Sequence, residues 1–160
     1  MRFIWVLAFV TLAIPCLGQT AGKAEIFPGK DITSQLTSLT QSSKSSGSGG
    51  ATLGDYKSHA IKLSVRTASG KAEIHAHYDD IFFVTGGKAT LTTGGNAVNA
   101  KAGGDGESAG SSIEGGVSQP ISKGDVVHIP AGTPHQLTIA NGDIFSAIVV
   151  KVKEPDSQLP

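Results

Sequence analysis

The stretch GDVVHIPAGTPHQ, residues 124–136, contains a short apolar strand, a sharp turn and a histidine directly after the turn. Three residues restrict the backbone of this turn: Pro130, Gly132 and Pro134. Proline fixes φ, and glycine adopts conformations that other residues avoid, so the turn is rigid. His135 begins the next strand, where it shares a face with Leu137 and Ile139. A histidine held in this way has the fixed position that a metal ligand needs.

A second group of polar side chains lies in AEIHAHYDDIFFVTGG, residues 72–87. On an extended strand, side chains two apart point to the same face, so Glu73, His75 and His77 would project together. Three polar groups buried without partners would cost several kcal/mol. A divalent metal ion would satisfy them, because neutral imidazole and carboxylate both donate lone pairs. The alternative is an outer face, on which water hydrates all three.

The remaining pattern predicts an all-β domain. HAIKLSVR, residues 59–66, alternates between an apolar and a polar face. The segments DIFFVT and KATLTT flank Gly86-Gly87 and predict a β-hairpin. Four more short strands follow, in VSQPIS, GDVVHIP, HQLTIA and DIFSAIVVKV. About eight short strands with turns between them indicate a sandwich or a small barrel. Residues 102–116 contain six glycines and are expected to form a long mobile loop.

The N-terminal third of the chain divides into a signal and a connecting region. Arg2 precedes the apolar run FIWVLAFVTLAI, which is too short to span a bilayer comfortably and ends at Pro15. Residues 1–18 are therefore predicted to be a cleaved secretion signal, with a membrane anchor or a lipid-modified Cys16 as the alternatives. The mature protein would be secreted or periplasmic, with no stable membrane insertion. A short helix capped by Asp31 and a flexible Ser/Gly linker over 41–51 would follow.

Four segments describe the expected domain organisation: a signal (1–18), a tether with the helix and linker (19–53), the β-barrel domain (54–153) and a tail (154–160). The full sequence has 13 Lys and Arg residues against 13 Asp and Glu residues, and no basic run. A neutral chain of this kind lacks the electrostatic footprint of a nucleic-acid-binding protein.

The two polar stretches together resemble the two motifs of the cupin superfamily. The second motif, G-x5-P-x-G-x2-H-x3-N, is matched at four positions: Gly124, Pro130, Gly132 and His135. Its last position departs from the pattern, with Ile139 in place of Asn. The first motif, G-x5-H-x-H-x3-4-E-x6-G, is matched in part by HAHYDDIFFVTGG. The resemblance covers residues 56–152 and implies a small jelly-roll, or double-stranded β-helix, barrel; the short helix would precede it.

The first motif can be aligned in two registers. Asp80, six residues and Gly87 match E-x6-G with Asp for Glu, and this register implies a ligand set of Glu73, His75, Asp80 and His135. The pair His75 and His77 gives the other register, a three-histidine set with His135 and a shortened spacing to Asp80. The resemblance implies a divalent transition metal, namely Fe, Mn, Ni, Zn or Cu. A decayed site without metal is the alternative.

For function, the cupin resemblance implies action on a small organic molecule. An oxygenase, isomerase or lyase reaction would use the metal, and residues 102–116 would act as a lid. The alternative is a non-enzymatic barrel that binds a small ligand such as a sugar. Cupin barrels often pair, so a homodimer is expected. Whether the chain is an enzyme stays open at this point.

Overall fold

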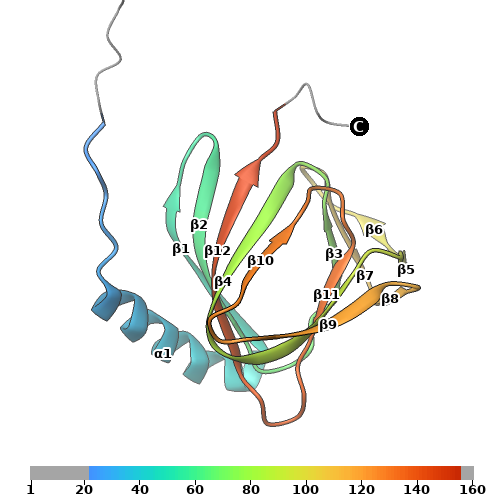
Figure 1. Ribbon diagram of the computed structural model, residues 1–160, viewed down its shortest axis with the longest axis horizontal. Helices are drawn as coiled ribbons and strands as arrows, with labels where there is room; N and C mark the ends of the chain where they lie inside the picture. The colour runs from blue at the N-terminus through green and yellow to red at the C-terminus, as the bar shows by residue number, and fades with distance from the viewer. Residues whose placement is uncertain (1–21, 156–160) are drawn as a thin grey trace, which may run out of the picture.

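The computed structural model describes residues 22–155, which form one helix and twelve strands (Figure 1). In chain order these are α1 (Gly29–Ser46), β1 (Ser48–Asp55), β2 (His59–Arg66), β3 (Ala72–His75), β4 (Tyr78–Thr93), β5 (Asn96–Val98), β6 (Lys101–Ala102), β7 (Glu107–Gly110), β8 (Ser112–Glu114), β9 (Val117–Ser122), β10 (Val126–Ile129), β11 (His135–Thr138) and β12 (Phe145–Lys153). The predicted signal, residues 1–18, lies outside the described residues.

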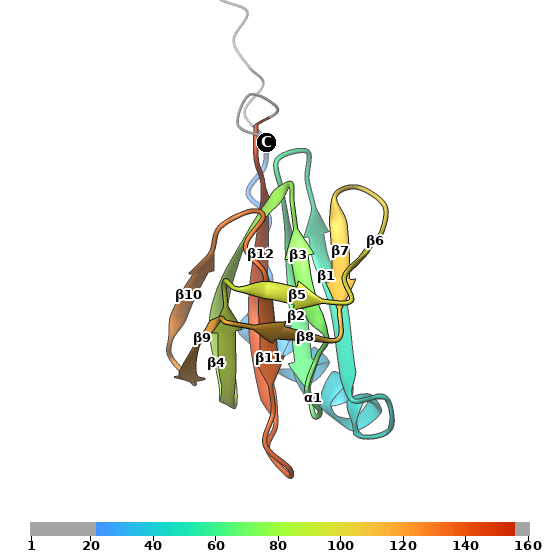
Figure 2. The same cartoon turned by 90° about the vertical axis from the view of Figure 1, so that its right-hand side faces the viewer.

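The strands form one antiparallel sheet that curls around on itself (Figures 1 and 2). Its path is β1-β2-β12-β4-β11-β3-β7-β6, with β9 and β10 attached to β4. The long strand β4 joins the two halves, because its first part pairs with β12 and β10 and its second part with β11 and β9. This arrangement is the cupin-like double-stranded β-helix, so the predicted fold class is confirmed. A second sheet contains only β5 and β8.

A closed apolar core lies between the two halves of the curled sheet. Its members come from five strands and one loop: Phe82, Val84, Ala89, Leu91, Ile121, Ile129, Leu137, Ile139, Phe145, Ala147 and Val149. Three of them, Phe82, Leu137 and Val149, also line a cavity of the barrel. Part of the cavity wall is therefore formed by apolar side chains of the core; these three residues are called the apolar floor below.

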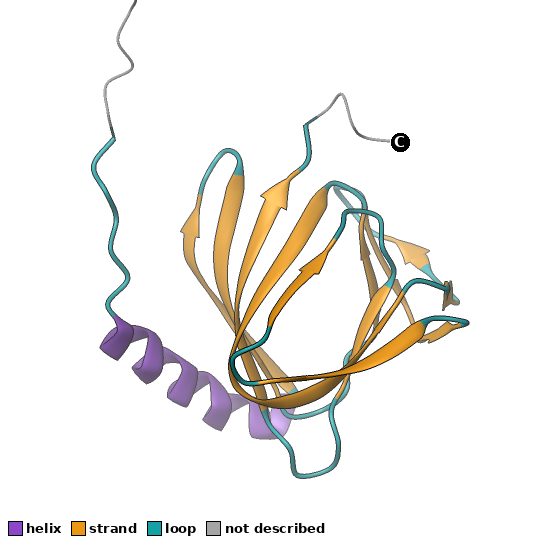
Figure 3. Cartoon of the chain, viewed as in Figure 1, coloured by secondary structure: helices purple, strands orange, loops and turns teal. Residues whose placement is uncertain are grey.

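Strand β2 has its polar face toward the cavity. Lys62, Ser64 and Arg66 line the cavity, and Leu63 contributes to its lining as well. Leu63 and Val65 are at most 1% exposed and are not members of the core cluster. Alternation places these two apolar side chains on the outer face of the sheet. Helix α1 packs against β1 and β2 on that side and covers them (Figure 3).

The predicted Ser/Gly linker over residues 41–51 is wrong. Helix α1 continues to Ser46, and β1 begins at Ser48 and pairs with β2 along its length. The small residues serve close packing here: Ser43 is fully buried, and a Cβ added to Gly49 would lie 2.6 Å from the Ser43 Oγ. Asp31 is not the N-cap either, because the helix begins at Gly29 after Pro28. This helix is not apolar and long enough to span a membrane, and it is the only one within residues 22–155.

Two further expectations about turns and loops are wrong. β4 continues without a hairpin through Gly86 and Gly87, and its register against β12 shifts there. Gly87 has a φ of 71°, and a Cβ at this position would stand 1.6 Å from the Ile144 carbonyl oxygen, so glycine permits a bend against a neighbouring chain segment. The supposed mobile loop 102–116 contains β7 and β8, and β7 is paired with β3.

The helix contact predicts a large stability effect at a residue outside the barrel core. Leu63→Ala should lower the free energy of unfolding by about 2–5 kcal/mol, because it removes fully buried apolar volume beneath α1. Urea unfolding followed by circular dichroism measures the change. Val126→Ala is the control, since Val126 is 64% exposed and its truncation should cost less than about 1 kcal/mol. Equal effects of the two substitutions would contradict the buried position of Leu63.

Candidate metal centre

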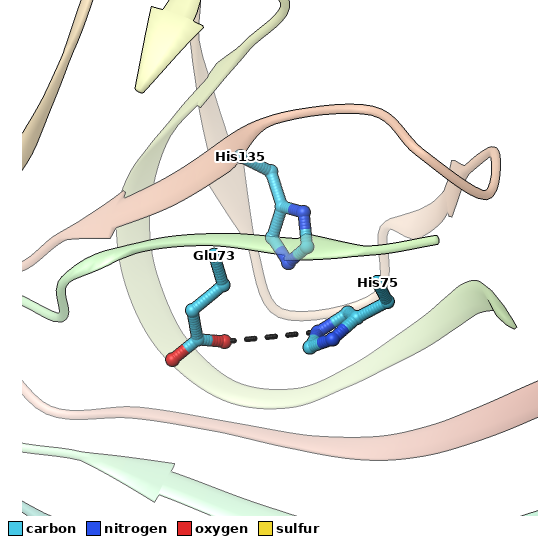
Figure 4. Close-up of side chains that lie close together, drawn as sticks. All are labelled: Glu73, His75 and His135. Carbon is cyan, nitrogen blue, oxygen red and sulfur yellow. Dashed lines mark ion pairs between the residues drawn. The ribbon is translucent and has the colours of Figure 1, made fainter. Parts of the chain in front are cut away.

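Four side chains from three strands converge at one end of the cavity. Glu73 and His75 come from β3, Asp80 from β4 and His135 from β11, and all four line the cavity. Strand register explains the convergence, because His135 pairs directly with Glu73 across β11 and β3. Figure 4 shows Glu73, His75 and His135 pointing toward one another. Asp80 and His135 are each only 4% exposed.

The donor atoms of these residues lie within a few ångströms of one another. The Nε2 atom of His75 is 3.3 Å from Asp80 Oδ2 and 3.8 Å from Glu73 Oε2. The Nε2 atom of His135 is 3.8 Å from Asp80 Oδ2. One ligand atom from each of Glu73, His75 and His135 lies within 4.8 Å of the others. The four residues therefore surround one point.

His135 presents a free lone pair to this point. Its Nδ1–H donates to the carbonyl oxygen of Thr133 at 3.0 Å, and that oxygen can only accept. Burial lowers the pKa of His135 below the usual value for histidine, so the ring is neutral near pH 7. With the proton held on Nδ1, the Nε2 atom is an acceptor. It faces the Asp80 carboxylate, which is also an acceptor.

His75 is oriented by a carboxylate that the sequence did not indicate. The Nδ1 atom of His75 contacts the carboxylate of Glu107, the residue directly opposite it on β7. The carboxylate accepts, so Nδ1 carries a proton, and in the singly protonated ring Nε2 is free to bind a cation. A carboxylate on the outer nitrogen of a histidine is a common feature of metal-binding histidines.

Each carboxylate of the cluster also has a cationic partner on its outer oxygen. Arg66 donates to Glu73 Oε1 at 3.2 Å, and Lys151 donates to Asp80 Oδ1 at 2.9 Å. Lys151 faces Asp80 because the two residues pair across β12 and β4. The other oxygen of each carboxylate, Oε2 of Glu73 and Oδ2 of Asp80, points to the histidines. The outer hydrogen bonds thus fix how the carboxylates are turned.

With His75 singly protonated, these contacts leave four electron-pair donors facing one point with no hydrogen-bond donor among them. A cation there would remove the repulsion between them. In a metal site with bonds of about 2.1 Å, no two ligand atoms are more than about 4.2 Å apart. The three histidine–carboxylate separations of 3.3 and 3.8 Å agree with that limit, whereas the 4.8 Å that bounds Glu73, His75 and His135 together exceeds it. Two imidazoles with one or two carboxylates are a donor set that Fe, Mn and Zn accept.

His77 lies apart from this cluster. Strand β3 ends at His75, and the chain turns over residues 76–77, so the alternation that would align His77 with His75 is broken. The His77 Nδ1 atom faces Asp105 at 3.7 Å, and its side chain is 31% exposed. The structure therefore brings together the residues of the register with Glu73, His75, Asp80 and His135. The three-histidine register would need the turn to rearrange.

The cavity around the cluster has a volume of about 520 Å³. It is lined by the four converging residues and by Lys62, Leu63, Ser64, Arg66, Gly70, Lys71, Phe82, Glu107, Gln136, Leu137, Val149 and Lys151. This volume suits a small organic ligand. Gln136 is not free to bind one, because its amide donates to the carbonyl oxygen of Gly70 at 2.9 Å.

Sequence reasoning missed three charged residues of the centre. For Lys151 a signal existed: it continues the inward face of β12 after Phe145, Ala147 and Val149. A lysine at the end of an apolar face marks either the rim of a cavity or a buried ion pair. The polar face of β2 likewise contained Arg66. No pattern indicated Glu107, because its segment is rich in glycine.

Comparison with known proteins bears on the fold. No model of a protein family matches the sequence, and no curated protein matches it. Solved structures do match. The TT1209 protein from Thermus thermophilus is 13% identical, with a TM-score of 0.50, and the match covers 69% of this chain and 87% of that one.

Two other solved structures are similar at a slightly lower level. The DMSP lyase DddQ from Ruegeria pomeroyi is 19% identical, with a TM-score of 0.49 over 71% of this chain and 49% of the lyase, so the match spans about half of that protein. A sugar phosphate isomerase from a cupin superfamily, from Silicibacter pomeroyi, is 21% identical, with a TM-score of 0.47, over 71% of this chain and 64% of that one. At such identities, the likeness concerns the fold alone.

The hydrogen bond to Thr133 predicts the tautomer of His135. In metal-free protein near pH 7.5, long-range ¹H–¹⁵N correlation spectra should show Nδ1 protonated and Nε2 bare, because the Thr133 carbonyl oxygen needs a donor. His135→Gln assigns the resonances by removing them. Protonation of Nε2 in place of Nδ1 would contradict the orientation described here.

Proposed function

We propose that this protein is a cupin that binds one divalent transition metal ion through Glu73, His75, Asp80 and His135. The observation that supports this is the alignment of four lone-pair donors on one point, each held by a partner on its outer side. When bound, such an ion acts as a Lewis acid toward an oxygen of the bound molecule. The chain itself contributes a cavity with an apolar floor of Phe82, Leu137 and Val149 in which a small substrate is oriented beside the cluster.

We propose further that the metal-loaded cavity catalyses a reaction of a small organic molecule, of the oxygenase, isomerase or lyase type. The buried end of the cavity supports this, because Asp80 and His135 are almost fully shielded from water. Electrostatic interactions are stronger in such a shielded site than in bulk solvent. Lys151 lies on the cavity wall beside Asp80, and its ammonium group has protons to donate to a bound molecule.

A second candidate function is ligand binding without metal, and one observation favours it. Arg66 and Lys151 already supply positive charge to Glu73 and Asp80, as a decayed metal site would require. In that case the barrel would bind a small molecule such as a sugar and leave it unchanged. Metal content, followed by consumption of a substrate, distinguishes the two functions.

The metal proposal predicts one ion per chain. Titration of metal-free protein with Mn²⁺ or Zn²⁺ by calorimetry should give a single site. His75→Ala and His135→Ala should each weaken it by at least about 100-fold, which is about 2.7 kcal/mol, because each removes a ligand.

His77→Ala is the matched control for this titration. It removes the same side chain two positions from His75, and it should leave metal affinity within about threefold of the unchanged protein, because His77 faces Asp105. Absence of binding to the unchanged protein would contradict the proposal. Equal losses in the His75 and His77 variants would instead show that the three-histidine register is the correct one.

We also propose that the protein is exported after cleavage of residues 1–18, because an apolar run flanked by Arg2 and Pro15 has the pattern of a secretion signal. Mass spectrometry of the protein from a bacterial periplasm or culture medium should give a chain that begins near Gln19. An intact N-terminus on protein that stays in the cytoplasm would exclude export.

A further inference from the structure

The walls of the metal cavity have more cationic side chains than carboxylates. Four cationic residues line it, namely Lys62, Arg66, Lys71 and Lys151, against the three carboxylates Glu73, Asp80 and Glu107. Arg66 and Lys151 pair with carboxylates of the cluster. Among residues 22–155, Lys62 and Lys71 have no carboxylate within ion-pair distance. Two ammonium groups of the cavity are therefore available to a ligand.

Lys62 lies on the inner face of the barrel, in the row of cross-strand neighbours next to the row that contains Asp80. Its cross-strand neighbour is Val149 on β12, and Val149 pairs in turn with Phe82 on β4. The adjacent row on the same face contains Lys151 and Asp80. Diagonal neighbours on one face are about 7–8 Å apart at the backbone, a distance that a lysine side chain spans. An acidic group beside the cluster is thus within reach of Lys62.

Lys71 belongs to the other half of the barrel. It directly precedes β3 and is two residues before Glu73, and β3 is joined to β11, whereas β2 is joined to β12. Both Lys62 and Lys71 are exposed, so they lie at the mouth while the cluster lies deeper. Both ammonium groups are therefore on the lining of the cavity that a ligand would enter.

We propose that the cavity binds a small organic anion whose acidic group is held by Lys62 and Lys71, with its hydrocarbon part on Phe82, Leu137 and Val149. This ligand class rests on the proposed function only for the positive charge that a bound metal ion would add. The metal-free cavity has one positive charge in excess, and a divalent ion at the cluster would raise the excess to three. A cavity with an excess of positive charge attracts negatively charged ligands, so the loaded cavity favours a ligand that brings negative charge.

The acidic group is a carboxylate or a phosphate, because lysine binds either as a compact charge with three donors. A neutral sugar would leave the two ammonium groups without a counter-ion. The apolar floor favours a ligand with a short carbon skeleton over an inorganic anion, which would leave that floor uncovered. The ligand class is therefore a short organic acid or a small phosphate ester.

Calorimetric binding of four probes tests this inference at fixed ionic strength. Succinate and glycerol 3-phosphate carry the acidic groups, and succinamide and glycerol are their neutral counterparts. Each is titrated into metal-free and Zn²⁺-loaded protein. At least one of the two anions should bind at least about tenfold more tightly than its neutral counterpart, and the preferred anion identifies the acidic group.

The variant Lys62→Gln/Lys71→Gln should weaken binding of that anion by at least about tenfold and should leave Zn²⁺ affinity unchanged or higher. Lys123→Gln is the control, because Lys123 is exposed and lies outside this cavity. It should bind the anion as the unchanged protein does. Both lysines of the double variant are exposed, so the substitutions leave the core untouched.

The outcomes separate this inference from the proposed function. Normal Zn²⁺ binding, with anions no better bound than neutral probes or with equal binding by the double variant, would overturn the anion site alone. Failure of Zn²⁺ to bind, with lysine-dependent anion binding in metal-free protein, would overturn the metal proposal and support the anion site. Absence of anion binding in both forms overturns the anion site whatever the metal result.

Discussion

The charged centre of this protein depends on the register of antiparallel strand pairs. On β3, Glu73 stands opposite His135 of β11 on one side, and His75 stands opposite Glu107 of β7 on the other. On β4, Asp80 stands opposite Lys151 of β12. Directly paired residues have their side chains on the same face and close together, so these registers bring donors and partners into contact without any special loop. A slip of one residue in β3 would turn Glu73 and His75 to the outer face.

The register also explains why the centre is polar inside an apolar barrel. When each histidine carries one proton, that proton lies on Nδ1, toward Glu107 in His75 and toward the carbonyl oxygen of Thr133 in His135. The inner nitrogens and the inner carboxylate oxygens are then all acceptors. Such a group is stable only if a cation lies among them or if one histidine takes up a second proton. Since burial lowers the pKa of His135, a second proton on that ring is disfavoured.

The sequence predicted the strand pattern and the meeting of two distant segments, for identifiable reasons. The turn with Pro130, Gly132 and Pro134 is a local feature, and it does place His135 at the start of β11. The alternation of HAIKLSVR likewise matches β2. His77 was placed on the face of His75 because alternation was extended past the end of β3, where the chain turns. The alternation of residue types along a sequence does not show where a strand ends.

Composition misled where small residues have a packing role. Serine and glycine over 41–51 were interpreted as flexibility, but there they allow α1 to approach β1 closely. The same error hid Glu107, because a glycine-rich segment was taken for a loop although it contains the strand that pairs with β3. Long-range pairing decides both cases, and no local window of sequence contains it. The metal ligands themselves stay predictions that only binding measurements test.

If the proposed metal ion binds, the two cations on the outer oxygens would link metal binding to ligand choice. A carboxylate that shares its charge with Lys151 or Arg66 donates less strongly to a metal than a free carboxylate does, so these pairs lower the affinity of the centre for an ion. They also keep the cavity positive after an ion has bound, because neither cation can leave the wall. Carboxylates that share their charge with Lys151 and Arg66 would neutralise less of the charge of a bound ion. The remaining positive charge would attract an anionic ligand more strongly. Under the two proposals, the arrangement would therefore favour recognition of an anion over maximal retention of the metal.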